Sequence, residues 1–189
     1  MLEQLLQYDK DLFLFLNGMG TPGWDGFWMF MTKTRNSFPL YALLLYLPYK
    51  NFGWKKTGII LVAVALMITC TDQLSNFFKY GIGRLRPCYD PEIGEAMRLV
   101  KGYCGGKFGY FSAHAANSFA PAIFFTVLFH GKVKYLGIVL LIWAGIVAYS
   151  RIYIGVHFPL DVFTGALIGV LFGWLFAKLA IFAFQKMGT

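Results

Sequence analysis

Charged residues are scarce in this sequence. They make up 14% of the 189 residues, whereas a soluble domain carries about 25%. Hydrophobic residues reach 58%, and the mean hydropathy is +0.58. This composition excludes a disordered or collagen-like chain and is typical of a membrane protein.

Acidic residues and cysteines are also few. The chain has 9 Asp and Glu against 17 Lys and Arg, which gives a net charge of +8. The basic residues are not interleaved with solvated polar stretches, so we expect no nucleic-acid partner. Three cysteines are too few for a disulfide framework. No carboxylate or Cys/His cluster predicts a metal, and no cofactor is expected.

Long apolar runs are what the sequence does contain. Five of them follow one another, separated by polar or basic turns: 38–49, 57–80, 112–129, 135–149 and 159–184. Such runs are too long and continuous for barrel strands. They predict an all-α, polytopic membrane helix bundle with about six transmembrane helices, forming one membrane-embedded domain over 1–189.

The first 37 residues allow two interpretations. Two short apolar stretches lie on either side of the Gly- and Pro-rich breaker 17–23. The segment is therefore either an amphipathic helix in the membrane interface or a broken first span.

The turns alternate between the two sides of the membrane. Segments 33–37, 81–111 and 150–158 share one side, and 50–56 and 130–134 share the other. The second side has five lysines and no acid, which is typical of the cytoplasmic side. We therefore expect a multi-pass protein of the cytoplasmic (inner) membrane, with the long 81–111 loop facing the periplasm or exterior.

Polar residues gather in three clusters beside the turns of this outer side. The clusters contain Lys79 and Arg86, Ser112 and His114, and Arg151, His157 and Asp161. Ionisable residues at the ends of membrane helices indicate a functional site. Guanidinium forks, a lysine and the backbone N–H groups of a helix start are suited to binding a phosphate group.

Two histidines add catalytic chemistry to these cations. Asp161 follows His157 by four residues, which places both side chains on one helix face. The carboxylate can then accept the Nδ1–H of the imidazole and leave Nε2 as a nucleophile. With His114 as the second imidazole, the sequence predicts two-step phosphoryl transfer, in which one ring attacks phosphorus and the other protonates the leaving oxygen.

The three clusters resemble the motifs of the integral-membrane type 2 phosphatidic acid phosphatases, which share their phosphate cage with vanadium haloperoxidases. The first cluster reads K-x6-R-P, the third reads S-R-x5-H-x3-D, and 111–114 lies where the family has P-S-G-H. The resemblance implies that His157 is the nucleophile, Asp161 orients it and His114 is the general acid. It also implies that phosphate is bound, without metal, by Lys79, Arg86, Ser112 and Arg151.

The activity that the resemblance implies is hydrolysis of a lipid-linked phosphate or diphosphate at the outer membrane face, through a phosphohistidine. The expected partners are membrane lipids and the substrate, which would be undecaprenyl diphosphate, phosphatidylglycerophosphate, phosphatidic acid or a lipid A phosphate. Two alternatives stay open. One is a phosphatase for a soluble ester, and the other is a non-catalytic anion-binding transporter or scaffold.

The second motif departs from the family pattern, because Phe111 replaces Pro and Ala113 replaces Gly. If the glycine must adopt a positive φ, Ala113 is strained by about 1 kcal/mol or more. If it only allows a close backbone approach to phosphate, alanine is a small intrusion.

The outer loop holds three more residues of interest. Arg84 either contacts a lipid headgroup or has no role in the site. Cys88 and Cys104 both lie in this loop, where a disulfide between them is expected if the loop is outside the cytoplasm.

Two spacing patterns concern the bundle itself. Asp72 and Asn76 precede Lys79 at helical spacing, which predicts a polar stripe facing the bundle interior. Gly165, Gly169 and Gly173 recur every fourth residue, which predicts close approach of a neighbouring helix within the bundle.

Overall fold

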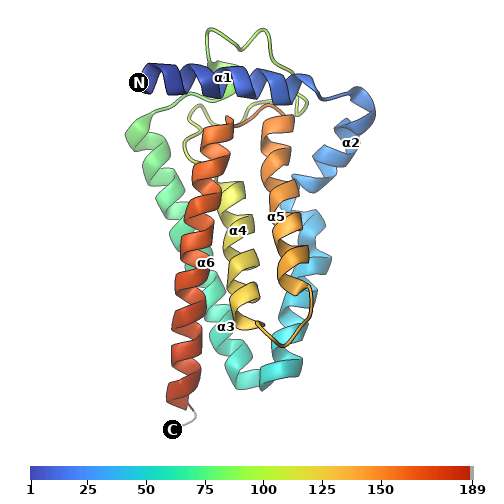
Figure 1. Ribbon diagram of the computed structural model, residues 1–189, viewed down its shortest axis with the longest axis vertical. Coiled ribbons are helices and arrows are strands. Elements are labelled where there is room, and N and C mark those ends of the chain that lie inside the picture. Colours follow the sequence, from blue (N-terminus) through green and yellow to red (C-terminus); the bar gives the residue numbers. More distant parts are fainter. Residues whose placement is uncertain (188–189) are drawn as a thin grey trace.

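The computed structural model describes residues 1–187 as a helical bundle (Figure 1). The helices are α1 (Leu2–Gly18), α2 (Pro22–Met31), α3 (Phe38–Ile82), α4 (Ala113–Leu128), α5 (Leu136–Tyr153) and α6 (Pro159–Met187), with short 3₁₀ turns η1 (Thr34–Ser37) and η2 (Pro87–Tyr89). Among residues 1–187, β pairing is limited to one isolated bridge between Leu85 and Phe108. The prediction of an all-α membrane bundle is confirmed.

Helix α3 contains two of the predicted apolar runs. Its regular φ/ψ angles are interrupted at Gly53, whose φ is 76°. Glycine tolerates this left-handed angle because it has no Cβ. The two arms of α3 therefore diverge from a kink (Figure 1). The basic segment 50–56 was expected to be a turn between two spans. The chain does change direction there, at Gly53, with helical residues on both sides of it.

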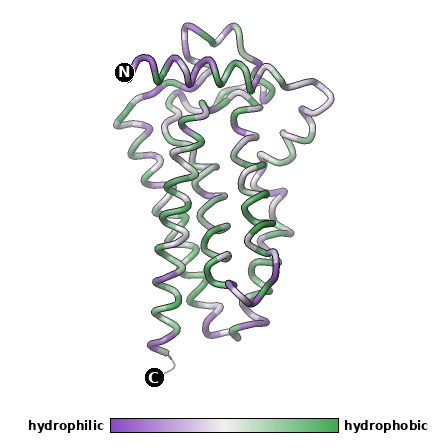
Figure 2. Tube along the Cα trace, viewed as in Figure 1, coloured by the Kyte–Doolittle hydropathy of each residue, from purple (hydrophilic) through white to green (hydrophobic). Residues whose placement is uncertain are grey.

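Three helical segments are long and apolar enough to cross a membrane: Thr34–Ile82, Leu136–Tyr153 and Pro159–Met187. Helix α4 has only 16 residues, which corresponds to about 24 Å. It lies among the others, and its buried residues come from successive turns. Figure 2 shows apolar colour along the bundle and hydrophilic colour gathered towards its two ends.

Helices α4 and α6 pack with unusually little space between them. A Cβ on Gly165, Gly169 or Gly173 would collide with a carbonyl oxygen of α4, and these oxygens belong to Ser112, Ala116 and Ala120 respectively. The predicted role of the glycine repeat is therefore confirmed, with α4 as the partner helix.

The N-terminal helix lies across one end of the bundle, at a steep angle to the long helices, and α2 slopes down from it (Figure 1). The buried face of α1 consists of Asp9, Phe13 and Asn17. Of the two interpretations of this segment, an interfacial α1 agrees with this orientation.

The loops separate into two groups at opposite ends. The α3 kink and the turn between α4 and α5 lie at one end. The loops 83–112 and 154–158 lie at the other end, near α1, and part of the 83–112 loop rises above α1 (Figure 1). Helix α3 ends at this second end because Gly83 adopts a left-handed φ of 67°. The three motif clusters therefore meet at one end of the bundle.

The α4–α6 contact predicts the effect of adding one methyl group. We expect Gly169→Ala to lower the free energy of unfolding by about 1–3 kcal/mol, because the two backbones must separate. Gly145→Ala in α5 is the matched control, since a Cβ there meets open space. Thermal unfolding in detergent measures both, and equal melting temperatures for the two variants would contradict the packing argument.

Candidate active site

The motif residues lie in or next to four helices, at the same end of the bundle. Lys79 lies in the last turn of α3, and Arg86 lies in the loop after it. Ser112 and His114 open α4, and Arg151 lies in the last turn of α5. His157 precedes α6, and Asp161 lies in its first turn. The structure brings all seven predicted residues together.

The His157–Asp161 pair is fully enclosed. His157 Nδ1 lies 3.4 Å from Asp161 Oδ2, and the exposed fractions are 2% and 0%. The same carboxylate oxygen accepts a 3.1 Å hydrogen bond from the Phe158 backbone N–H. The Gly109 backbone also hydrogen-bonds to the His157 ring. The imidazole is thus held on its Nδ1 side, which leaves Nε2 for chemistry.

Gly109 is required for this close packing. A Cβ built on it would lie 3.1 Å from Arg86 Cγ, 3.1 Å from Asp161 Oδ2 and 3.6 Å from His157 Nδ1. These distances show that the first and third motifs converge on the backbone just before the second motif.

Positive charge surrounds the nucleophile candidate. Burial, together with the charges of Arg86, Arg151 and Lys79, lowers the pKa of His157 well below its ordinary value of 6.5. The ring is therefore neutral at physiological pH, as a nucleophile must be. Its surroundings disfavour a second positive charge and favour an anion.

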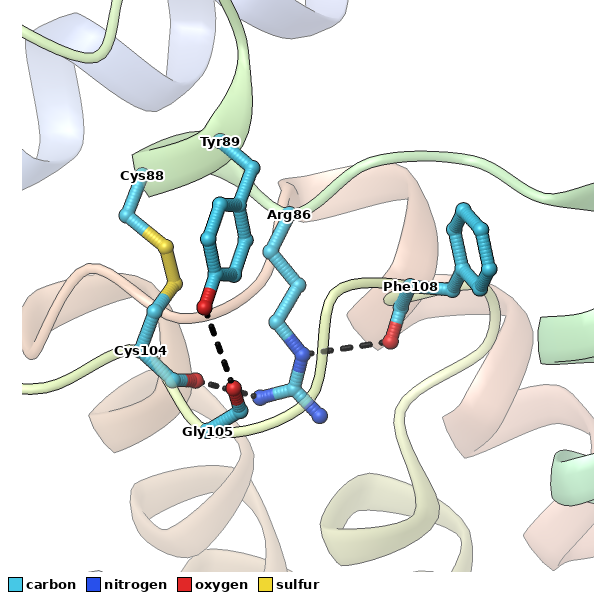
Figure 3. The surroundings of a disulfide bond; sticks show 6 residues. All are labelled: Arg86, Cys88, Tyr89, Cys104, Gly105 and Phe108. Carbon is cyan, nitrogen blue, oxygen red and sulfur yellow. Dashed lines mark hydrogen bonds between the residues drawn. A yellow bond between two sulfur atoms is a disulfide. The ribbon is translucent and has the colours of Figure 1, made fainter.

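Arg86 is held by the outer loop. Its Nε donates to the Phe108 carbonyl at 3.2 Å, and its Nη1 donates to the Cys104 carbonyl at 3.0 Å (Figure 3). Cys104 is bonded to Cys88, with their Cα atoms 6.2 Å apart. The expected disulfide is therefore present, and it fixes the backbone that positions this guanidinium.

Arg151 is 4% exposed. Its Nη1 donates to Thr32 Oγ1 just after α2, while its buried Nε has no hydrogen-bond partner within residues 1–187. A buried donor without a partner costs free energy. A phosphate oxygen is the kind of acceptor that this position can serve.

Ser112 and Ala113 begin α4. Ser112 is the N-cap, and its Oγ accepts from the Ala115 N–H at 3.5 Å. Ala113 is helical, and Tyr135 is the one non-glycine residue of the described chain with a positive φ. Alanine therefore fits where the family has glycine, without the left-handed strain considered above.

His114 lies one residue inside α4. Electrostatic interactions link its imidazole with Arg151, His157, Lys101 and Lys79. It also lines a cavity of about 710 Å³ that extends away from the site. The cavity is walled mainly by apolar residues of both α3 arms, α4 and α5, including Leu44, Ile60, Val64, Phe125 and Trp143.

The prediction of a polar stripe on the inner face of α3 is confirmed only in part. Asp72 lines the cavity and accepts a 2.7 Å hydrogen bond from Asn117 of α4. Asn76 is exposed, so its predicted inward orientation was wrong. Across residues 1–187, no group of three or more His, Cys, Asp or Glu side chains is arranged to hold a metal ion.

Sequence reasoning missed the roles of two charged residues next to the site. Arg84 donates to Asp161 Oδ1 at 2.8 Å and also to Asp9 of α1. Neither interpretation given for Arg84, a headgroup contact or no role, describes this bridge. One signal was available: Asp9 is a charged residue on the face of α1 that also carries Phe13.

Comparison with known proteins identifies a family. The family model described as "PAP2 superfamily" matches residues 56–184. Two relatives, both called lipid A 4′-phosphatase, align over nearly the whole chain. The one from Bacteroides thetaiotaomicron is 44% identical and covers 95% of this chain and 80% of the relative. The one from Porphyromonas gingivalis is 36% identical and covers 96% and 77%.

A solved structure agrees with these matches. The crystal structure of Aquifex aeolicus LpxE aligns with a TM-score of 0.64 at 31% sequence identity. The alignment covers 89% of this chain and 93% of that chain. The similarity therefore includes the arrangement of helices as well as the sequence.

The loop contacts of Arg86 predict the effect of removing the disulfide. In a Cys88→Ser/Cys104→Ser variant, we expect the loop to loosen and the Cys104 carbonyl to move away from Arg86. Stability should fall by about 3 kcal/mol, as estimated for a loop of this size. The KM for a phosphate ester should rise a few-fold. Thermal unfolding and steady-state kinetics measure both, with Cys70→Ser as the control because Cys70 is unpaired. Values equal to those of the control would contradict the proposed link.

Proposed function

The chain belongs to the PAP2 superfamily and is a membrane lipid phosphatase, and we propose that it hydrolyses a phosphate monoester of a lipid A-type glycolipid through a phosphohistidine. One observation carries this proposal: the neutral His157 lies among three cations, at the end of the bundle where His114 opens onto an apolar cavity. This arrangement suits a phosphate group attached to a hydrocarbon chain.

In the first step, Nε2 of His157 attacks phosphorus and the bond from phosphorus to the lipid oxygen breaks. His114 gives its proton to that oxygen, so the lipid leaves as a neutral alcohol. Asp161 stabilises the positive charge that develops on the His157 ring. Arg86, Arg151 and Lys79 offset the negative charge that spreads over the three equatorial oxygens.

In the second step, water attacks the phosphohistidine. His114, now without its proton, accepts one from the water as the new oxygen–phosphorus bond forms. The phosphorus–nitrogen bond breaks, and inorganic phosphate leaves with the enzyme restored. The fixed cations supply the charge stabilisation throughout, so the mechanism has no step that requires a metal ion.

The cavity supports a lipid substrate over a soluble one. Its lining is mostly apolar and includes His114, which protonates the leaving oxygen in our scheme. A hydrocarbon chain in this cavity holds the attached phosphate near the two imidazoles. The names of the two relatives that align over nearly the whole chain favour the 4′-phosphate of lipid A among the substrates considered.

The orientation follows from charge. The end opposite the site carries Lys50, Lys55, Lys56, Lys132 and Lys134. Because lysines are enriched on the cytoplasmic side, this end is cytoplasmic and the site faces the periplasm or exterior of the inner membrane. A transporter or scaffold role is less well supported, because the named relatives are phosphatases.

A substrate panel tests the reaction. We expect the purified protein to release phosphate from bisphosphorylated lipid A faster than from phosphatidic acid, phosphatidylglycerophosphate or undecaprenyl diphosphate. Mass spectrometry should show loss of the 4′-phosphate, and chelators should have no effect.

His157→Ala should reduce the rate to background, and His114→Ala should reduce it by about 10²–10⁴-fold. Alkaline quenching should trap acid-labile phosphate on the protein but not on His157→Ala. Faster hydrolysis of another lipid would overturn the proposed lipid A substrate. Absence of trapped phosphate on the wild-type protein would overturn the phosphohistidine intermediate.

The role of the cavity can be tested separately. We expect Val64→Trp to fill it and lower kcat/KM for the long-chain lipid about tenfold or more, with an unchanged rate on a short soluble phosphate ester. Val62→Trp is the matched control, because Val62 is exposed and lies outside this cavity. If Val64→Trp affects the two substrates equally, the cavity does not hold the lipid chain.

A further inference from the structure

Arg84 forms a bridge between two carboxylates. Its Nη1 donates to Asp161 Oδ1 at 2.8 Å, and its Nη2 donates to Asp9 Oδ2. Its guanidinium carbon lies 4.4 Å from the centre of the Phe158 ring. Only 15% of its side chain is exposed. Because two carboxylates occupy its donors, Arg84 serves a different purpose from Arg86, which lies two residues later.

Asp9, at the other end of the bridge, is bonded to α6, the helix that also carries Asp161. Asp9 Oδ1 accepts a 2.8 Å hydrogen bond from the Leu160 backbone N–H in the first turn of α6. Backbone N–H groups in a first turn have no partner within their own helix. Asp9, which is 6% exposed, therefore caps α6 from a different helix and holds Arg84 at the same time.

These contacts determine how Asp161 is turned. One of its oxygens is engaged by Arg84, and the other meets His157 Nδ1 and the Phe158 N–H. Asp161 has no exposed surface, so Arg84 also supplies its counter-charge. Without Arg84, the carboxylate is held through one oxygen only and loses the cation that favours its ionised form beside the imidazole.

Helix α1 is fixed where it makes this contact. Phe13 is fully buried and packs edge-on against Phe158, with ring centres 5.3 Å apart. Lys10 pairs with Asp90 at 3.0 Å, and Asn17 donates to the Tyr153 carbonyl at 2.9 Å. Aromatic packing, an ion pair to the outer loop and a hydrogen bond to the end of α5 therefore hold Asp9 in place.

We propose that Asp9 and Arg84 are positioning residues, which act through Asp161 to orient the nucleophilic His157. The inference rests on the proposed function, because it assigns a role to groups behind the nucleophile. The interfacial helix α1 is then a working part of the active site as well as a contact with the membrane surface. In this proposal neither residue binds the phosphate.

The test is a double-mutant cycle measured on the full chain in detergent, with the lipid phosphate that the wild-type protein hydrolyses best. We expect Asp9→Asn to lower kcat by about 10- to 100-fold with little change in KM, because a misplaced catalytic group slows chemistry more than binding. In an Asp161→Asn background, the same substitution should lower kcat by less than twofold. A residue that only stabilised the fold would lower kcat by the same factor in both backgrounds.

Two further variants keep the test decisive. Asp11→Asn lies on the exposed side of α1 and should leave kcat unchanged. If Asp9→Asn does not fold, Arg84→Lys is used in the same cycle. A lysine can pair with only one of the two carboxylates, so Arg84→Lys should lower kcat in the wild-type background. In the Asp161→Asn background, the same substitution should leave kcat nearly unchanged. An unchanged kcat, or equal losses in both backgrounds, would overturn the positioning role. An inactive wild-type protein would instead overturn the proposed function.

Discussion

The active site depends on positive charge that the bundle holds together and only partly neutralises. Arg86, Arg151 and Lys79 all act on the buried His157, while the buried carboxylate of Asp161 is shared with Arg84. Like charges in a poorly solvated site repel one another strongly. Covalent and packing constraints maintain this arrangement, so a phosphate group that enters meets donors already in place. This preorganisation is the main source of electrostatic catalysis.

The close contact between α4 and α6 sets the spacing of the residues that we propose to be catalytic. The glycine repeat lets α6 approach the carbonyls of α4, beginning at Ser112. At the same end, the Ser112 N–H donates to the Asp161 carbonyl at 2.9 Å. His114 lies on one of these helices, and His157 directly precedes the other. A change in helix packing far from the site would therefore alter the separation of the two imidazoles.

The same bundle also provides space for the lipid substrate proposed above. The kink at Gly53 separates the arms of α3, and both arms line the cavity below His114. The long loop, closed by its disulfide, holds Arg86 through the Cys104 carbonyl. In the function proposed above, the phosphate lies among the cations and the hydrocarbon chain lies in the apolar cavity, and His114 is close to both.

The sequence by itself determined the helical class, the apolar runs and the seven motif residues, because hydropathy and the spacing of polar groups are local properties. The i,i+4 relation of His157 and Asp161 is of this kind. The turn expected in 50–56 is present as the kink at Gly53, but the sequence did not show that helical residues continue up to it on both sides. Only the tertiary structure decided that Asp9 meets Arg84, 75 residues away, and that Arg84 holds Asp161. Such contacts depend on how whole helices dock, and a charged residue on an amphipathic helix has no local pattern that names its partner.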